Sequence, residues 1–334
     1  MSDRVPLPET AEYARRVEAL GFDVLHVPET VHDSMQVALL ALMSTERLRV
    51  QTSLTLAFPR SPMLLALQAW DLARFGGRFD LGLGSQIRQN IEGRFGVPWR
   101  DPIRWMNDYV ETVRAIWRSF ADGSPLDVRT DAYRLDRLQP FFVPEPVETP
   151  PRIWLGGVGP RAVDLAARVA DGYVTHPTNS HPEYLRRVVE PALARAERSP
   201  IVDVAIPFAT GRTESDVETS RLRQRGVLAF LLSTPAYSPT IELFGWHDLG
   251  PELRRIIRSG EWSALPTAID DEQFDTLVPS GTWHQLPDII GEWYGRLADG
   301  VLLQPPDDPR LDDEFSEVVA RTRGIPDRSG RSTS

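Results

Sequence analysis

Residues 166–177 read Ala-Ala-Arg-Val-Ala-Asp-Gly-Tyr-Val-Thr-His-Pro, and they predict the end of a helix followed at once by a buried strand. The Ala170-Asp171-Gly172 turn between the two is typical of a tight helix-to-strand connection, in which glycine takes the left-handed position that ends a helix. Similar turns occur at 20–23 (Leu-Gly-Phe-Asp) and 298–300 (Ala-Asp-Gly). The repeat predicts a chain in which helices and strands alternate.

The rest of the chain fits this alternation. Helices are predicted at 8–20, 62–75 and 106–120, the last from apolar residues spaced i, i+3, i+4 and i+7. Seven apolar or β-branched runs are predicted to be strands: Val24–Pro28, Leu48–Phe58, Phe79–Gly84, Ile153–Val158, Tyr173–Pro177, Val202–Ala209 and Val301–Gln304. Apolar strands separated by helices imply a parallel sheet covered on both faces. In a chain of 334 residues they favour a closed (β/α)8 TIM barrel, an α/β fold, over an open doubly wound sheet.

We expect one barrel domain over residues 1–323. The chain opens directly on the helix at 8–20, which is the helix that should follow a first strand. The first barrel strand is therefore expected to be missing or truncated, with only residues 1–7 left to form it.

Two further segments stand outside the alternating pattern. The long segment 210–283 before the last strand contains helical stretches at 217–232 and 251–258, and we predict a lid-like insertion there. The final residues, 324–334, are rich in Gly, Ser and Arg and are predicted to be a disordered tail.

Composition excludes several kinds of chemistry. The chain contains no cysteine and no lysine, so all 37 basic residues are arginine. Disulfides, thiolate nucleophiles and Schiff-base lysines are therefore impossible. A net charge of −10 argues against a nucleic-acid partner, since phosphate neutralisation needs a basic face. With no long apolar run, no signal peptide and no His-Glu-x-x-His arrangement, we expect a cytoplasmic protein without membrane or metal partners.

Four polar residues follow predicted strands, where a barrel carries its functional groups. Glu29 and His32 come after the strand at 24–28, and they could serve as general base and hydrogen-bond partner or simply be solvated in a surface loop. Gln86 follows the strand at 79–84. His176 closes the strand at 173–177, where both a structural and a catalytic role are open.

Small residues surround two of these strand ends. Gly84 and Ser85 would let a planar ligand approach the backbone, although glycine also marks tight packing. A glycine-rich turn leads from the strand at 153–158 into a helix, and its residues are Gly157, Val158, Gly159, Pro160 and Arg161. Free N–H groups at a helix N-terminus with an arginine beside them favour a phosphate site; a plain helix cap is the alternative.

Two aromatic pairs are candidates for the floor of a substrate pocket. They are Phe141-Phe142 and Phe244 with Trp246. Ordinary packing in the core or the insertion explains both pairs equally well.

Six segments occur in an order that resembles the luciferase-like monooxygenase superfamily, above all its actinobacterial branch that depends on coenzyme F420. They are Ala19–Asp23, Val27–Thr30, Arg60–Pro62, Gly77–Ser85, Gly159–Arg161 and Ala170–Gly172. The likeness extends from about residue 8 to residue 305. It implies a luciferase-like TIM barrel, a small-molecule substrate and a homodimer.

The resemblance also implies roles for particular residues. The Gly157–Arg161 turn would hold the coenzyme phosphate. Ser53 and Leu54, with Thr55 after them, look like the bulge where family members carry a non-prolyl cis peptide behind the deazaflavin ring. Glu29 matches an acidic residue that contacts the ring system.

Two departures from the family's sugar-phosphate dehydrogenases are informative. Gln86 stands where those enzymes have a glutamate proton donor, and the lysines that they use for a sugar phosphate are absent from this chain. Sugar-phosphate oxidation is therefore not expected.

The hypothesis from the sequence is an oxidoreductase that transfers a hydride between C5 of coenzyme F420 and a small, rather apolar organic substrate. Glu29, His32 and His176 are the candidates for proton handling, with Gln86 orienting the substrate. An FMNH2-dependent monooxygenase on the same fold is the first alternative. A barrel that binds a flavin without catalysis is the second.

Overall fold

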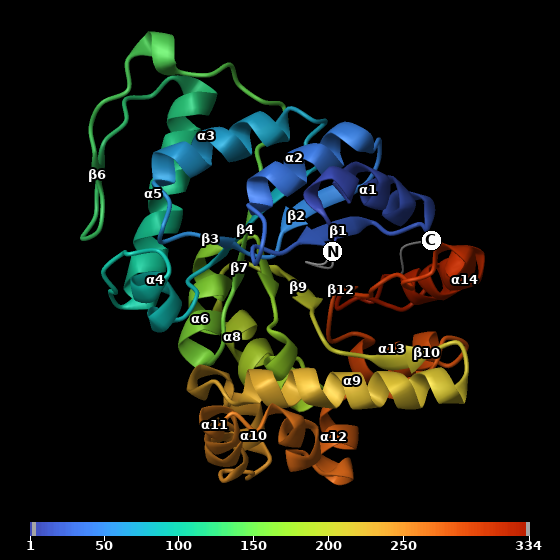
Figure 1. Ribbon diagram of the computed structural model, residues 1–334. Coiled ribbons are helices and arrows are strands. Elements are labelled where there is room, and N and C mark those ends of the chain that lie inside the picture. Colours follow the sequence, from blue (N-terminus) through green and yellow to red (C-terminus); the bar gives the residue numbers. More distant parts are fainter. Residues whose placement is uncertain (2–4, 332–334) are drawn as a thin grey trace. The chain divides into compact units, whose positions relative to one another are not determined.

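The computed structural model describes residue 1 and residues 5–331, and they form an α/β structure of two compact units. The first unit contains Met1–Gly156 and Leu165–Gly172, and the second contains Gly157–Asp164 and Tyr173–Ser334. Each unit is a set of strands with helices packed on them (Figure 1).

The first unit is built on parallel strands that follow one another in chain order. They are β1 (Val24–Val27), β2 (Arg49–Thr52), β4 (Phe79–Gly84) and β7 (Arg152–Gly156), and the short β3 (Thr55–Leu56) also pairs with β4. Helices cover one side of these strands (Figure 1). They are α1 (Thr10–Ala19), α2 (Ser34–Ser44) and α3 (Pro62–Ala73), and α5 (Pro102–Asp122) packs on α3. Smaller elements are η1 (Leu7–Glu9), α4 (Arg88–Gly93), the antiparallel β5 (Val128–Arg129) and β6 (Arg134–Leu135), and η2 (Pro140–Phe142).

The second unit carries the remaining strands. They are β8 (Gly172–Val174), β9 (Ile201–Val204) and β12 (Gly300–Val301), with β12 parallel to β9, and a separate parallel pair, β10 (Ala209–Gly211) and β11 (Ser280–Thr282). Helix α6 (Pro160–Val169) begins in this unit. The other helices up to the insertion are η3 (Pro177–Asn179), α7 (Pro182–Tyr184), the π-helical η4 (Leu185–Val189) and α8 (Glu190–Arg195). The later ones are α9 (Glu214–Leu232), η5 (Pro235–Tyr237), α10 (Pro239–Leu243), α11 (Leu249–Ser259), η6 (Trp262–Ala268), α12 (Asp271–Leu277), α13 (Leu286–Tyr294), η7 (Pro309–Leu311) and α14 (Asp312–Arg323).

The predicted α/β barrel class is confirmed, and each predicted run overlaps at least one strand; β4 has the predicted bounds, whereas the bounds of the other strands differ. The run predicted at 48–58 is divided into β2 and β3 at a cis peptide bond between Ser53 and Leu54, where the resemblance placed a bulge. The run predicted at 202–209 is likewise divided, because β9 ends at Val204 and β10 begins at Ala209. Apolar patterning reveals that a segment is buried but does not locate a break in its ladder.

The termini were expected to hold a poor strand and a disordered tail. Residues 2–4 of the 1–7 stretch lie outside the described residues, and the part that follows forms a bend and then η1. Of the tail, residues 324–331 are described, and Arg328 there forms an ion pair of 3.4 Å with Asp299. The remaining tail residues, 332–334, lie outside the described part.

The turn glycines are required for two different reasons. Gly21 has a φ of 86°, the left-handed conformation that the sequence predicted for all three turns. That prediction was wrong for Gly172 and Gly300, which begin β8 and β12 without a positive φ. A Cβ on Gly172 would lie 2.3 Å from the Trp154 ring, and one on Gly300 would lie 2.3 Å from an oxygen of Asp203. These two positions exclude a side chain because another side chain already occupies the space.

The insertion has a hydrophobic core of its own. Helices α9, α10, α11 and α12 supply buried residues that include Leu228, Leu232, Ile241, Leu253 and Phe274. The helical stretches predicted at 217–232 and 251–258 are confirmed by α9 and α11. In the described part of the chain, every helix is too short or too polar to cross a membrane.

Candidate functional site

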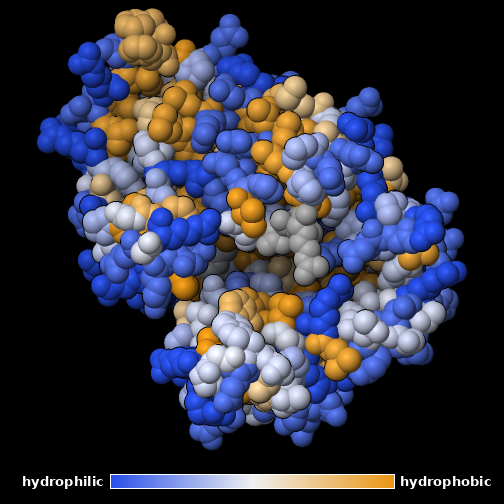
Figure 2. Space-filling model, viewed as in Figure 1, coloured by the Kyte–Doolittle hydropathy of each residue, from blue (hydrophilic) through white to orange (hydrophobic). Residues whose placement is uncertain are grey.

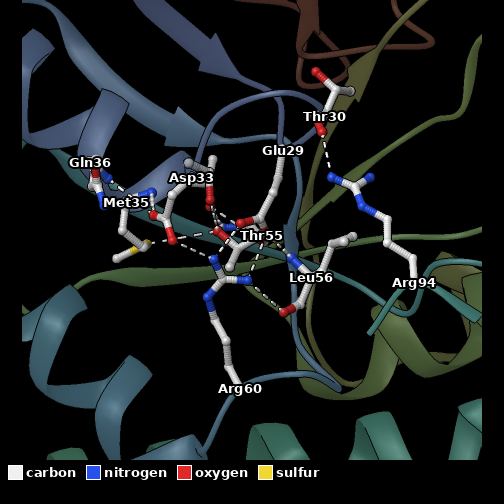
Figure 3. A network of polar contacts seen from close by, with 12 residues as sticks. Glu29, Thr30, Asp33, Met35, Gln36, Thr55, Leu56, Arg60 and Arg94 are labelled. Atoms are coloured by element: carbon white, nitrogen blue, oxygen red, sulfur yellow. Dashed lines mark hydrogen bonds and ion pairs between the residues drawn. The ribbon is translucent and has the colours of Figure 1, made fainter. Parts of the chain in front are cut away.

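Glu29, which follows β1, lies at the centre of a polar network in the first unit (Figure 3). One of its carboxylate oxygens accepts the N–H of Leu56 at 2.6 Å and a guanidinium N–H of Arg60 at 2.9 Å. The other oxygen accepts a second N–H of Arg60. Both oxygens are therefore engaged, and they tie the loop after β1 to β3 and to the residues before α3.

Arg60 joins Glu29 to the neighbouring Asp33. Its guanidinium also pairs with Asp33 at 2.8 Å and donates to the carbonyl oxygen of Leu56 at 3.2 Å. Burial alone would lower the pKa of Arg60, but the carboxylates of Glu29 and Asp33 outweigh it and raise that pKa above its ordinary value. Asp33 in turn caps α2 by accepting the N–H of Met35 at 2.9 Å. Arg60 therefore stays charged and holds both acids in place.

His32 and Gln86 stand apart from this network. The imidazole of His32 is half-buried and makes no hydrogen bond or ion pair with any described residue. Gln86 follows β4 with a φ of 57°, in the left-handed region that non-glycine residues rarely adopt. Its side-chain oxygen accepts the N–H of Ile87 at 2.9 Å, so the amide nitrogen is the end that can still donate.

The Leu54 side chain fills the space that the strand glycines leave open. A Cβ added to Gly156 would lie 2.3 Å from Leu54, and one added to Gly84 would lie 3.0 Å from it. The absence of a side chain at Gly84 therefore leaves room for the side chain of Leu54. Thr55 is buried beside it, and its hydroxyl shares a 2.8 Å hydrogen bond with Ser34.

The glycine-rich turn of the second unit leads into α6 as predicted. Gly159 has a φ of 88°, and no atom lies within 4 Å of the position that a Cβ would occupy. Its N–H donates to the hydroxyl of Tyr184 at 3.1 Å, while the hydroxyl of Tyr173 donates to the carbonyl oxygen of Gly157 at 2.8 Å. Burial raises the pKa of both tyrosines, so both hydroxyls keep their protons. Two buried phenols thus shape the turn, and Pro160 and Arg161 are exposed on it.

His176, at the start of η3, is engaged through one ring nitrogen. Its Nδ1 lies 2.8 Å from the Thr178 hydroxyl and accepts the Thr178 N–H at 3.3 Å. The ring stacks on Tyr237 of η5 with 4.0 Å between centroids. Burial lowers the pKa of His176 to about 4, which leaves the imidazole neutral at physiological pH.

Sequence reasoning missed three residues of these arrangements. Arg60 was noted only as part of a family segment, and Tyr173 and Tyr184 were not singled out at all. A signal for Arg60 exists, because two acids four positions apart, Glu29 and Asp33, need a cation once they are buried. Nothing in the local sequence distinguishes the two tyrosines from core residues.

The aromatic pairs do not both behave as pocket residues. Phe141 and Phe142 on η2 are 77% and 60% exposed, and Figure 2 shows hydrophobic atoms at that tip of the first unit. Phe244 and Trp246 stack with centroids 5.0 Å apart and pack against the core of the insertion. No group of three potential metal ligands occurs among the residues that the structure describes.

A comparison with models of protein families identifies the family of this chain. Residues 1–300 match the model of the luciferase-like monooxygenase family. The chain belongs to that family. Membership confirms the resemblance seen in the sequence and supports an enzyme of the oxidoreductase class.

Three relatives illustrate the range of the family around this chain. An uncharacterised protein of Mycobacterium tuberculosis is 38% identical over 305 residues, with 89% of each chain covered. A 5,10-methylenetetrahydromethanopterin reductase of Archaeoglobus fulgidus is 24% identical, covering 89% of this chain and 88% of the other. A Mycobacterium tuberculosis protein provisionally named a coenzyme F420-dependent oxidoreductase is 31% identical over 51% of each chain.

Solved structures confirm the fold. The coenzyme F420-dependent tetrahydromethanopterin reductase of Methanopyrus kandleri superposes with a TM-score of 0.73 at 16% identity, covering 94% of both chains. The oxygenating part of a 3,6-diketocamphane monooxygenase of Pseudomonas putida, solved with FMN, gives a TM-score of 0.64 at 16% identity over 96% of this chain and 92% of the other. The luciferase-like fold is thus shared with proteins that use either coenzyme.

Proposed function

We propose that this luciferase-like protein is an F420-dependent oxidoreductase that transfers a hydride between the deazaflavin and a small, rather apolar organic substrate. The observation that carries the proposal of a phosphate-bearing coenzyme is the glycine turn at the start of α6. The choice of F420 rests on the relative named for F420 dependence, which is 31% identical over half of the chain.

Two features of the turn support a phosphate site there. Gly159 has a left-handed backbone, and apart from its chain neighbours nothing lies within 4 Å of the position that a Cβ would occupy there. A helix N-terminus carries partial positive charge and favours an anion. Gly157, Val158, Gly159, Pro160 and Arg161 are the residues that would hold the phosphate of the coenzyme.

Ser53, Leu54 and Thr55 are the residues proposed to lie behind the ring of the coenzyme, with Gly84 and Ser85 at the neighbouring strand end. The half-buried side chain of Leu54 packs beside Gly156 and Gly84, and this packing holds the Leu54 backbone in place. When bound, the deazaflavin supplies two-electron hydride chemistry.

Glu29 and His32 are proposed to have different roles, the first in positioning and the second in proton transfer. Glu29 accepts hydrogen bonds on both oxygens, from Leu56 and Arg60, so both oxygens are already engaged. We therefore assign Glu29 the positioning of Leu56 and Arg60. His32 has a free imidazole and is the residue proposed to give or take the proton, with the Gln86 amide orienting the substrate.

An FMNH2-dependent monooxygenase is the second candidate, because FMN also carries a phosphate that the same turn would accept. The monooxygenase solved with FMN shares the fold at a TM-score of 0.64. A flavin-binding barrel without catalysis is the third. We also propose that the protein is cytoplasmic and forms a homodimer. Light scattering on the purified protein would test the dimer.

The experiment is a calorimetric titration with F420 and, separately, with FMN. We expect F420 to bind and FMN to bind weakly. Preference for FMN, together with oxygen consumption in the presence of reduced FMN, would change the assigned function to that of a monooxygenase. Binding of F420 without turnover over a broad set of alcohols, ketones and activated alkenes would favour the barrel without catalysis.

A matched pair of variants tests the phosphate turn. Arg161→Ala should weaken F420 binding by roughly 1–3 kcal/mol, the usual loss for a charge-assisted hydrogen bond. Arg310→Ala removes an exposed arginine paired with Asp308 and should leave the affinity unchanged. Equal affinities of wild type and Arg161→Ala contradict the assignment of the turn.

A further inference from the structure

A buried path of hydrogen bonds connects the insertion to His176. The hydroxyl of Thr240, on α10, donates to the side-chain oxygen of Asn179 at 3.0 Å. The side-chain nitrogen of Asn179 donates to the Thr178 hydroxyl at 2.8 Å, and that hydroxyl lies 2.8 Å from Nδ1 of His176. Thr240 and Asn179 are completely buried, and Thr178 is 4% exposed. Water cannot substitute for a partner along this path.

The contacts at the imidazole decide which atom donates and which accepts in each hydrogen bond of the path. The backbone N–H of Thr178 approaches Nδ1 of His176 at 3.3 Å, which favours a lone pair on that nitrogen, and the hydroxyl of Thr178, closer at 2.8 Å, decides between the two tautomers. The Thr178 hydroxyl accepts from Asn179 and therefore gives its own proton to Nδ1. The proton of a neutral imidazole is then left on Nε2, the nitrogen opposite.

We infer that the insertion locks His176 as the Nε2–H tautomer, so that it serves as a neutral hydrogen-bond donor to an oxygen of the bound ligand, with Thr178, Asn179 and Thr240 as positioning residues. No described residue accepts a hydrogen bond from Nε2 of His176. A carbonyl or anionic oxygen of the bound coenzyme is the chemistry that this donor fits. The ligand half of the inference rests on the proposed function, whereas the tautomer does not.

The surroundings of the ring keep it neutral. From η3 it meets Thr178, and from η5 it meets the face of Tyr237, whose own pKa is raised by burial. Neither neighbour is charged at neutral pH. His176 is therefore expected to donate a hydrogen bond without exchanging its proton, which separates its role from that of His32.

The tautomer can be measured in the ligand-free protein. With ¹⁵N-labelled histidine, the ring nitrogens of the six histidines are resolved by NMR, and loss of one set in His176→Gln assigns His176. We expect an unprotonated Nδ1 and a protonated Nε2 between pH 6 and pH 8. A protonated Nδ1, or signals averaged between the two forms, overturns the inference.

Two variants test the path itself. Asn179→Asp removes the donor to Thr178, so the Thr178 hydroxyl turns to the new carboxylate and the Nδ1 signal of His176 moves toward the protonated range. Asn107→Asp is the matched control, since it makes the same change at an exposed position that bonds Glu111. His181, whose Nδ1 accepts the N–H of Glu183 at 3.0 Å, is an internal reference that should not change.

Thr240→Val provides a second test if Asn179→Asp fails to fold. It keeps the shape of residue 240 and removes only the hydroxyl that orients Asn179, so the His176 signals should become averaged between the tautomers. Unchanged ring signals in a folded Thr240→Val protein also contradict the inference.

Titration with F420 tests the ligand half. We expect the Nε2 signal of His176 to shift on binding, and His176→Phe to weaken binding about tenfold, as for one lost hydrogen bond. His176→Gln, which keeps a donor, should lose much less. Binding of F420 without any shift of Nε2 overturns the donor role. A failure to bind F420 with the tautomer as expected overturns the proposed function and, with it, the donor role, while the locked tautomer stands.

Discussion

At the scale of single residues, Arg60 is the cation that makes two partly buried acids tolerable. Its guanidinium pairs with Glu29 and Asp33. The exposed fraction of the side chain is 19% for Arg60, 10% for Glu29 and 36% for Asp33. A charge removed from water needs a partner, because the solvation that it loses is not otherwise replaced. The conformation of the loop after β1 therefore depends on one residue before α3.

Removing this cation should destabilise the protein. Arg60→Met keeps most of the side-chain volume but leaves the Glu29 carboxylate without its main partner. We expect a loss of about 2 kcal/mol in the free energy of unfolding, measured by urea denaturation. Arg310→Met, which breaks an exposed pair with Asp308, is the control and should cost close to nothing. Equal stabilities for the two variants would show that the network is only a surface feature.

At the scale of elements, β7 and β4 accommodate the bulge between β2 and β3. The Leu54 side chain occupies the space that would otherwise hold side chains at Gly84 and Gly156. Interiors are packed so closely that even one methyl group there has no room. Glycine is therefore needed at these two strand ends because the side chain of Leu54 occupies the space beside them.

Adding that methyl group tests the packing. Gly156→Ala should cost about 1–3 kcal/mol, the usual range for overpacking, and Leu54→Ala in the same chain should recover part of the loss. Gly291→Ala in α13 is the matched control, because nothing lies within 4 Å of its Cβ position and alanine favours a helix. Thermal unfolding of the four proteins measures the effect. No recovery in the double variant would mean that Leu54 is not the obstacle.

At the scale of the whole molecule, two buried histidines make stability depend on pH. Burial lowers the pKa of both His176 and His181 from 6.5 to about 4. Between those values the unfolded chain binds about one more proton per histidine than the folded protein. Their effect on stability is therefore absent above pH 6.5, and stability falls as the pH drops from 6.5 toward 4.

The expected outcome is a lower melting temperature at pH 5 than at pH 7. His181→Asn should reduce this difference, because asparagine can still accept the N–H of Glu183 but does not titrate. Calorimetric scans at both pH values measure it. An identical pH dependence in wild type and His181→Asn would show that His181 takes up its proton in the folded protein as readily as in the unfolded chain.

The order of the strands and helices was predictable because it rests on local information. Helix periodicity, apolar runs and turn residues each involve neighbours within a few positions, and together they predicted the α/β barrel class. The α6 turn belongs to the same group, since Gly159 and Pro160 specify it within a few residues. The cis peptide at Ser53-Leu54 was located by family resemblance and not by any local rule.

The amino-acid sequence by itself thus determined the fold class, the succession of elements, the chemistry excluded by the absence of cysteine and lysine, and the position of the glycine turn. Tertiary structure alone decided which groups are engaged. It paired Arg60 with Glu29 across 31 positions, placed Leu54 against Gly156, and connected Thr240 to Asn179 across 61 positions. The physical reason is that hydrogen bonds and close packing depend on distance in space, which local sequence patterns do not encode.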